Sequence, residues 1–409
     1  MQVKSWRTRP ARAGTAVLLA ALAVELTDEV VDGTKSAALP LIRQSLALSY
    51  GQIGLLASVP LLLGSLLEFP LGVLAGRGRA RRLAVLAGGV VFIITLVAAA
   101  AARSFTGLLA AFVIFFPASG AFVGLTQSGL MDADPQRREQ HMARWDLSGS
   151  VGSVTGPLLL VVVLAVRGDG EAGGGWRSAY LVLAALAAAA WLAVAANPPP
   201  LPGSPGPARP GAGAAWRQVL AALGQPGVAR CLVLLQVCDL LLDVLTGFLA
   251  LYLVAAGSAT PAQAALGVAV RLGAGLAGDA ALVWALERFR GLALLRASAA
   301  AAALLYPGFL LAPGIAAKLA LLAALSFATA PWYPLLQAEL YGSLPDHSGV
   351  AVSLSSAASL LGGLGPLAVG FLAQRAGLGW ALAVLALAPP ALLAGLRRSG
   401  GPRRPDGTR

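Results

Sequence analysis

The chain has 409 residues and a formal net charge of +12, yet only 12% of its residues are charged and 57% are hydrophobic. A soluble domain of this length does not need so much apolar sequence, so the composition excludes a globular cytosolic protein and indicates a polytopic helical membrane protein. The positive charge does not indicate nucleic acid as a partner, because the Arg residues lie in short tails and loops between apolar runs.

Apolar runs of about 20 residues, the length that spans a bilayer core, recur along the whole chain. We expect twelve transmembrane helices, at roughly 14–38, 52–75, 83–102, 105–130, 142–166, 177–196, 229–254, 263–286, 292–312, 316–341, 349–374 and 379–396. An even number of spans places both termini on one side. The Arg-rich loops lie on that side, which predicts a multi-pass protein of the cell (inner) membrane with both termini cytoplasmic.

Charged residues interrupt the first span. Five of them lie on one stripe of the helix, which is about a third of its circumference wide. These residues are Glu25, Asp28, Glu29, Asp32 and Lys35. Charges inside a membrane-length segment are expensive, so the stripe indicates function. We predict that Asp28 and Asp32 couple transport to protons, because two like charges one turn apart cannot both be ionised cheaply in a low-dielectric cavity. The alternative is that Lys35 neutralises part of the stripe through an i,i+3 pair with Asp32.

The pattern recurs in the seventh span. Asp239 and Asp243 stand 211 positions after the first pair of aspartates, and Gln236 stands 211 positions after Glu25. We therefore predict that Asp239 and Asp243 form a second proton-coupling pair at the same depth as the first.

Other landmarks repeat at nearly the same offset. Gln127 and Gln337 are 210 positions apart, and the Gly-Pro steps at 156–157 and 365–366 are 209 apart. Parallel six-helix repeats are one known transporter architecture. We therefore expect an all-helical membrane protein built from two pseudo-symmetric six-helix bundles that flank a central cavity.

A Pro- and Gly-rich stretch at 197–213 cannot continue a helix and predicts a linker. The predicted division is an N-terminal bundle (1–197), a cytoplasmic linker (198–228) in which 214–223 could form a short interfacial helix, and a C-terminal bundle with a basic tail (229–409).

The loop after the second span resembles a family signature. Its sequence, GVLAGRGRARR at 72–82, is similar to the Gly-x-Leu-Ala-Asp-Arg-x-Gly-Arg-Arg motif of the major facilitator superfamily, with Gly76 in place of the acidic residue. The resemblance covers nearly the whole chain. GSVTGP at 152–157 is similar to the core of the fifth-helix motif associated with drug/proton antiporters. The segments 38–42 and 48–55 resemble the fosmidomycin-resistance-type efflux proteins.

The resemblance implies gating roles at the loops and at the Gly-Pro steps. The gating residues that we expect are Arg77, Glu287, Arg288, Gly156, Pro157, Gly365 and Pro366. The glycines among them are also suited to close helix packing.

Further polar and aromatic residues inside spans are substrate-binding candidates, each with a structural alternative. Glu68 could face the cavity or pair with loop arginines, and Arg271 could bind an anionic group or extend to the interface. Amide groups could bind substrate or link helices, and Trp332 could line a cavity or pack. The full candidate set is Glu25, Glu29, Lys35, Glu68, Gln127, Gln236, Arg271, Trp332 and Gln337.

The excess of acid over base within the spans suits cations and protons. We predict a proton-coupled secondary active transporter that exports a small amphipathic or cationic compound by alternating access. The alternatives are an uptake symporter for a sugar or organic acid, held by Arg271 and Lys35, and a divalent metal-ion carrier. No phosphate-binding loop or activated nucleophile is evident, so we expect neither an enzyme nor a cofactor; a proton gradient supplies the energy. We also expect a monomer without a metal site of its own.

Overall fold

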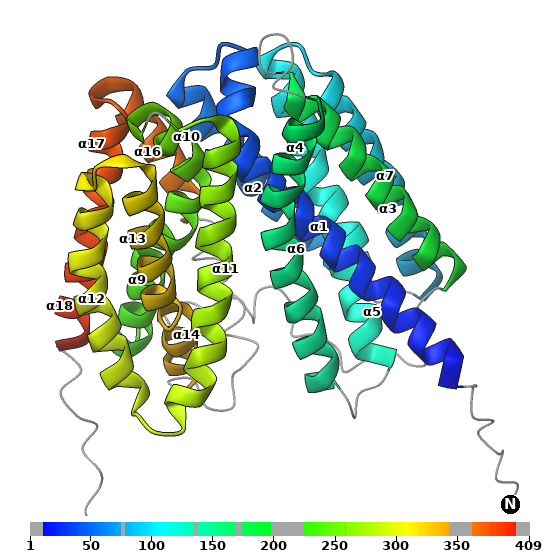
Figure 1. Ribbon diagram of the computed structural model, residues 1–409. Coiled ribbons are helices and arrows are strands. Elements are labelled where there is room, and N and C mark those ends of the chain that lie inside the picture. The colour runs from blue at the N-terminus through cyan, green and yellow to red at the C-terminus, as the bar shows by residue number, and fades with distance from the viewer. Residues whose placement is uncertain are drawn as a thin grey trace, which may run out of the picture. The chain divides into compact units, whose positions relative to one another are not determined.

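A computed structural model describes residues 11–74, 78–133, 138–167, 174–197, 224–257, 259–342 and 362–397, and every regular element in these ranges is a helix (Figure 1). Nine helical stretches among these residues are long and apolar enough to cross a membrane. The first helix, α1 (Ala11–Ser45), has 35 residues and carries the charged stripe. The predicted fold class, an all-helical membrane protein, is confirmed.

Each of the twelve predicted spans overlaps a described helix. Spans one to six correspond to α1, α2 (Tyr50–Leu74), α3 (Gly78–Ala101), α4 (Phe105–Ser119) with η1 (Gly120–Gly124) and α5 (Leu125–Ala133), α6 (Arg138–Arg167) and α7 (Gly175–Ala196). Spans seven to twelve correspond to α9 (Pro226–Asp239) with η4 (Leu240–Val244) and α10 (Leu245–Gly257), α11 (Pro261–Leu286), α12 (Gly291–Leu311), α13 (Gly314–Thr329) with α14 (Trp332–Gly342), α16 (Leu364–Ala376), and α17 (Leu378–Ala383) with η5 (Val384–Leu387) and α18 (Ala388–Arg397).

The helices group into two compact units. The first comprises Met1–Arg209, Gly247–Leu272 and Pro366–Leu378, and the second comprises Pro210–Thr246, Gly273–Gly365 and Gly379–Arg409. Most of the predicted linker, including the proposed interfacial helix, lies outside the described residues, so the division at 198–228 stays a prediction.

In the first unit, α1 packs along α6 more extensively than any other described pair of helices (Figure 1). Small residues allow this close approach. Thr34 Oγ1 donates a hydrogen bond to the Gly156 carbonyl oxygen at 3.0 Å. A Cβ at Gly156 would meet the backbone of α1 at Val30, Gly33 and Thr34. The predicted packing role of this glycine therefore has a physical basis, because any side chain there would push the two helices apart.

The start of α2 packs on α16 within the same unit. The backbone N–H of Gly51 donates to Gln374 Oε1 at 3.0 Å. A Cβ on Gly54 would lie 3.2 Å from the Gly370 Cα, so the two backbones touch through paired glycines. These residues join segments that are more than 300 positions apart in the sequence.

The second unit packs α12 against α13 and α9 against α14. Arg230 of α9 and Glu339 of α14 form an ion pair at 2.7 Å. The buried ammonium of Lys318 donates to the carbonyl oxygens of Phe309 at 3.1 Å and Leu310 at 2.9 Å. It thereby satisfies carbonyl groups that the last turn of α12 leaves without partners inside the helix.

Candidate functional site

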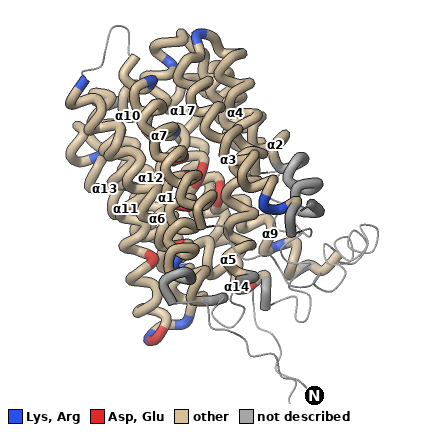
Figure 2. The backbone as a smooth tube through the Cα atoms, turned by 90° about the vertical axis from the view of Figure 1, so that its right-hand side faces the viewer, with Lys and Arg blue, Asp and Glu red and all other residues tan. Residues whose placement is uncertain are grey.

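The acidic residues of α1 form one continuous feature, the carboxylate stripe, which consists of Glu25, Asp28, Glu29 and Asp32. Figure 2 shows acidic positions midway along the helices near α1 and α6. Glu25, Asp28 and Glu29 are half-buried, whereas the Asp32 side chain is 60% exposed. The stripe therefore runs from packed surroundings to an accessible edge.

Two serine hydroxyls from other helices hold the middle of the stripe. Ser119 Oγ, at the end of α4, donates to Asp28 Oδ1 at 2.9 Å. Ser153 Oγ of α6 donates to Glu29 Oε2 at 2.7 Å. A hydroxyl can donate to a carboxylate or accept from a carboxylic acid. Each serine can therefore keep its partner in place in either protonation state.

Lys35 closes the stripe at its exposed end. Its ammonium pairs with Asp32 three residues earlier in the same helix. The alternative that the sequence offered, an i,i+3 pair, is therefore present in this structure. The pair accounts for one carboxylate and leaves three that Lys35 does not bond directly among the described contacts.

Glycines of α6 line the rear of the stripe. A Cβ at Gly149 would lie 2.7 Å from Glu25 Oε1, and a Cβ at Gly152 would lie 2.8 Å from the Glu29 Cβ. The acidic side chains thus occupy room that a larger residue in α6 would fill.

A π-helical turn accompanies the carboxylates in both units. The turn η1 begins directly after Ser119, which bonds Asp28, and η4 begins directly after Asp239 and contains Asp243. A π-helical turn inside an α-helix inserts one extra residue and is frequent at functional sites. The sequence analysis did not predict these turns. Pro117 and Gly120 were an available signal for η1, but no such residue marks η4.

In the second unit, Asp239 is half-buried and Asp243 is exposed. Gln236 Nε2 donates to Asp239 Oδ2 at 3.1 Å. Gln236 therefore contacts one of the predicted coupling residues directly. The structure brings Gln236 and Asp239 together, as it brings together the members of the first stripe.

The two units repeat one packing arrangement. Gly149 would place a Cβ against Glu25, and Gly362 would place one 2.7 Å from Oε1 of Gln236, the counterpart of Glu25. Gly365 would place a Cβ 3.2 Å from Val244, which stands 211 positions after the α1 glycine that faces Gly156. The internal repeat found in the sequence thus has matching contacts within each unit.

The other predicted substrate-binding residues have structural partners or packed positions. Gln127 Nε2 donates to Met142 Sδ at 3.8 Å, which links α5 to α6. Trp332 is fully buried, and its Nε1 donates to Ser298 Oγ at 3.0 Å. Arg271 is buried in α11, and Gln337 is half-buried in α14. A role for these four residues in binding substrate stays a prediction.

The predicted gating residues fall into three groups. Glu287 and Arg288 are exposed in the turn between α11 and α12, where the Arg288 guanidinium lies 4.0 Å above the Trp284 ring. Gly156 and Gly365 pack as described above, with Pro157 and Pro366 next to them. Arg77 lies outside the described residues, and the Glu68 side chain lies outside them too.

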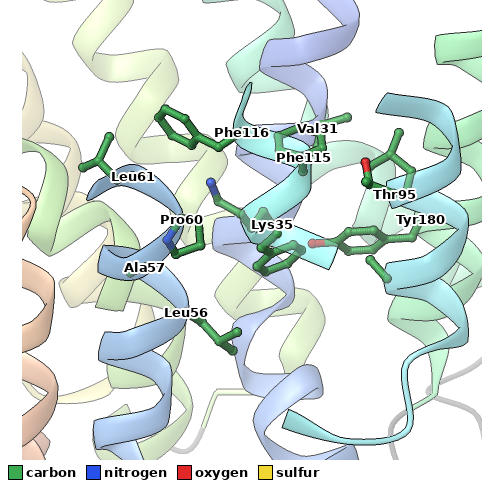
Figure 3. A pocket seen from close by; sticks show the side chains of 13 residues that line it. Val31, Lys35, Leu56, Ala57, Pro60, Leu61, Thr95, Phe115, Phe116 and Tyr180 are labelled. Carbon is green, nitrogen blue, oxygen red and sulfur yellow. The ribbon is translucent and has the colours of Figure 1, made fainter. Parts of the chain in front are cut away.

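A pocket opens beside the stripe in the first unit (Figure 3). Its walls are mostly apolar and aromatic, and the polar side chains among its lining residues are Lys35, Thr95 and Tyr180. In Figure 3 the Tyr180 side chain extends toward the middle of the view, and the Lys35 side chain extends toward the side lined by Pro60 and Leu61. Tyr180, Ser119 and Ser153 were missed by sequence reasoning, because a lone hydroxyl in an apolar span does not reveal which helix it faces.

Metal binding receives no direct support from geometry. Among the described residues, no group of three or more His, Cys, Asp or Glu side chains is placed to hold a metal ion.

Comparison with known proteins defines the class. The sequence pattern of the Major Facilitator Superfamily matches residues 30–364. No curated protein sequence matches the chain. The fold is similar to that of a bacterial homologue of the human lysosomal transporter Spinster, in an inward-facing and occupied conformation, with a TM-score of 0.77 and 18% identity over 96% of this chain and 97% of that one.

Two further solved structures share the fold. The nucleoside transporter NupG has a TM-score of 0.74 and 12% identity over 94% of this chain and 98% of that one. A POT family transporter in complex with 5-aminolevulinic acid has a TM-score of 0.74 and 12% identity over 97% of both chains. The family match and the membrane-length helices define a multi-pass membrane transporter, not an enzyme. The chain belongs to the Major Facilitator Superfamily.

Proposed function

We propose that this transporter is a proton-coupled secondary active antiporter that exports a small amphipathic or cationic compound by alternating access. The observation that carries the proposal is the carboxylate stripe of α1, in which four acids face one lysine within a membrane-length helix. Placing so many charges inside a membrane costs free energy, and a purely structural role does not account for that cost.

Proton exchange suits the middle of the stripe. Asp28 and Glu29 are adjacent in the sequence, and each accepts a hydrogen bond from a hydroxyl on a different helix. Ionising both at once brings two negative charges close together in a medium of low dielectric constant. Binding a cation lowers this cost, and so does binding a proton. Competition between the two for the same carboxylates is what an antiporter requires.

The second unit supports the same chemistry in a weaker form. Asp239 accepts from a neutral amide, Gln236, where the first unit has a fourth acid, Glu25. We propose that Asp239 and Asp243 take part in coupling and that α1 provides most of the cation binding.

The remaining assignments are part of the same proposal. We assign the transporter to drug/proton antiporter-like efflux proteins of the superfamily, in the inner membrane, as a monomer with both termini cytoplasmic. The fifth-helix sequence at 152–157 supports the efflux assignment, and the loop arginines support the orientation.

The direction of the gradient that drives accumulation tests the proposal. In proteoliposomes with an acidic interior, an antiporter accumulates external substrate as protons leave, whatever its orientation in the membrane. Ethidium is a suitable probe, because its permanent charge prevents it from accumulating passively as a weak base. We expect ethidium accumulation with an acidic interior and none in protein-free liposomes. Accumulation of substrate only with an acidic exterior would identify the uptake symporter instead.

A further inference from the structure

The pocket of the first unit offers hydrogen-bond donors whose acceptor is not evident among its walls. Its lining residues come from α1, α2, α3, α4 and α7, and none of them is acidic. The hydroxyl of Thr95 already donates to the Phe92 carbonyl oxygen at 2.8 Å. The donors left to a ligand are the Lys35 ammonium and the Tyr180 hydroxyl.

The buried hydroxyl of Tyr180 indicates a ligand site independently of Lys35. The residue is fully buried, and its hydroxyl oxygen has no hydrogen-bond partner among the described residues. Its ring is held by Trp176, edge to face at 5.6 Å between centroids, and by Phe112, stacked at 6.4 Å. A buried hydroxyl without a partner destabilises the folded protein. This hydroxyl points into the pocket, where a ligand oxygen would satisfy it (Figure 3).

Lys35 brings charge to the same space. The ammonium has three donor hydrogens, and the described contacts commit it to one carboxylate, that of Asp32. Its side chain remains 37% exposed. A ligand oxygen can therefore join or replace Asp32 beside the ammonium.

The walls define the rest of the ligand. Phe112, Phe115 and Phe116 of α4 face Leu56 and Pro60 of α2, so only an apolar body is accommodated without loss of hydration. The cavity has a volume of about 40 Å³. That is room for about three water-sized groups, enough for a carboxylate and the methylene group next to it.

We propose that this pocket, which Lys35 and Tyr180 both line, binds the carboxylate group of a monocarboxylic acid with an apolar body. The site selects an anion, in contrast to the carboxylate stripe. The inference goes beyond the proposed function, since it adds a recognition site for a second chemical group and does not depend on proton coupling or on the direction of transport.

The acidic residues near Lys35 affect how tightly a ligand carboxylate can bind. Among the described residues, the charged side chains that interact with Lys35 are Asp28, Glu29 and Asp32, all from α1, and the pocket-lining residues of α2, α3, α4 and α7 carry no charge. A ligand carboxylate therefore competes with Asp32 for the ammonium. Removing the charge of Asp32 is expected to tighten binding.

Calorimetric titration of the full-length protein in nanodiscs tests the proposal without any gradient. The probe is 4-phenylbutyrate, a monocarboxylate whose methylene chain and ring form an apolar body. The neutral 4-phenylbutyramide and the cationic 4-phenylbutylamine have the same body. We expect saturable binding of the acid at least tenfold tighter than that of the amide, because a charge-assisted hydrogen bond is about twice as strong as a neutral one.

Four variants locate the site. We expect Lys35→Met to weaken acid binding by about tenfold or more and Tyr180→Phe by about three- to tenfold. Ala57→Trp places a large side chain at an exposed lining position and should abolish binding with both donors intact. Asp32→Asn should tighten it. As the matched control, Tyr306→Phe removes a buried hydroxyl of the second unit that donates to the Leu382 carbonyl oxygen at 2.8 Å, and it should leave the affinity unchanged.

The outcomes separate clearly. Absence of saturable acid binding, equal binding of acid and amide, or affinity unaffected by both Lys35→Met and Ala57→Trp would each overturn the proposal. Loss of binding in Ala57→Trp and weaker binding in Tyr180→Phe, while the control binds normally, would support it. None of these results depends on whether transport is proton-coupled, so failure here leaves the proposed function standing, and the reverse also holds.

Discussion

Individual hydroxyl groups decide how the charged stripe is held. Ser119 and Ser153 reach the stripe from α4 and α6, so the two central carboxylates are fixed to two different helices. A change in protonation of Asp28 or Glu29 therefore acts directly on the contacts between α1 and its neighbours. This is the physical link between titration and movement that a coupled transporter needs.

Two buried tyrosines provide a matched test at this scale. Tyr180 has no partner for its hydroxyl, whereas the Tyr306 hydroxyl donates to a backbone carbonyl. We expect Tyr180→Phe to stabilise the ligand-free protein by about 1 kcal/mol and Tyr306→Phe to destabilise it by a similar amount. Thermal unfolding in detergent measures both. A lower melting temperature for Tyr180→Phe would show that its hydroxyl has a partner in the resting protein.

The sequence predicted local contacts and missed distant ones. The pair between Asp32 and Lys35 follows from their spacing, because residues three apart share a helix face. Ser119 and Asp28 are 91 positions apart, and nothing in either segment indicates that they meet. The hydrogen bonds of Lys318 could not be predicted either, because they depend on where α12 ends.

At the scale of helices, glycine contacts position α1 against α6. A Cβ at Gly156 would meet backbone atoms that cannot move aside, whereas a Cβ at Gly273 of α11 would meet nothing within 4 Å. We expect Gly156→Ala to destabilise the protein by about 1–3 kcal/mol. Gly273→Ala should be neutral or stabilise by up to about 1 kcal/mol, because Ala favours helix. The melting temperatures of the two variants test this prediction. Equal melting temperatures would contradict the close contact between α1 and α6 at Gly156.

The π-helical turn η1 makes a second prediction. Because such a turn contains one extra residue, deleting Gly124 should restore a continuous α-helix with regular backbone hydrogen bonds. Gly124 is exposed and a Cβ there would meet nothing within 4 Å. We expect the deletion to retain the fold and to lose transport, since it shifts Ser119 relative to α5. Deletion of Ala189 in the regular helix α7 is the control and should abolish folding. Full transport after loss of Gly124 would show that the turn has no functional role.

Helix positions were predictable, but their irregularities were not. Apolar length predicted twelve spans, each of which overlaps a described helix, and nine described helices are long and apolar enough to cross a membrane. The turns η1 and η4 depend on tertiary contacts, and only the Pro117 and Gly120 pair gave any local indication of one of them.

At the scale of the whole molecule, the distribution of Arg residues predicts orientation. Both termini should lie in the cytoplasm. Fusions of a fluorescent protein and of alkaline phosphatase to the C-terminus test this directly: we expect a fluorescent first fusion and an inactive second one. The native cysteines Cys231 and Cys238 are both buried, so single cysteines introduced into loops can confirm the result by labelling with little background. Phosphatase activity at the C-terminus would contradict the orientation.

The internal repeat was the most informative sequence signal for the site. It located Gln236, Asp239 and Asp243 from the pattern in α1, and the glycine contacts of both units follow the same spacing. The pocket beside Lys35 could not be predicted in this way, because five helices contribute to it.

Proton coupling through Asp28 and Asp239 is the central claim, and flux under an imposed pH gradient tests it most directly. Proteoliposomes containing wild-type protein, the double variant Asp28→Asn with Asp239→Asn, or the control Asp279→Asn are compared for gradient-driven substrate accumulation. Asp279 is an exposed carboxylate of α11, outside both sets of coupling residues. We predict that the double variant loses accumulation and its pH dependence while the control retains both. Undiminished, pH-dependent flux in the double variant would contradict the account.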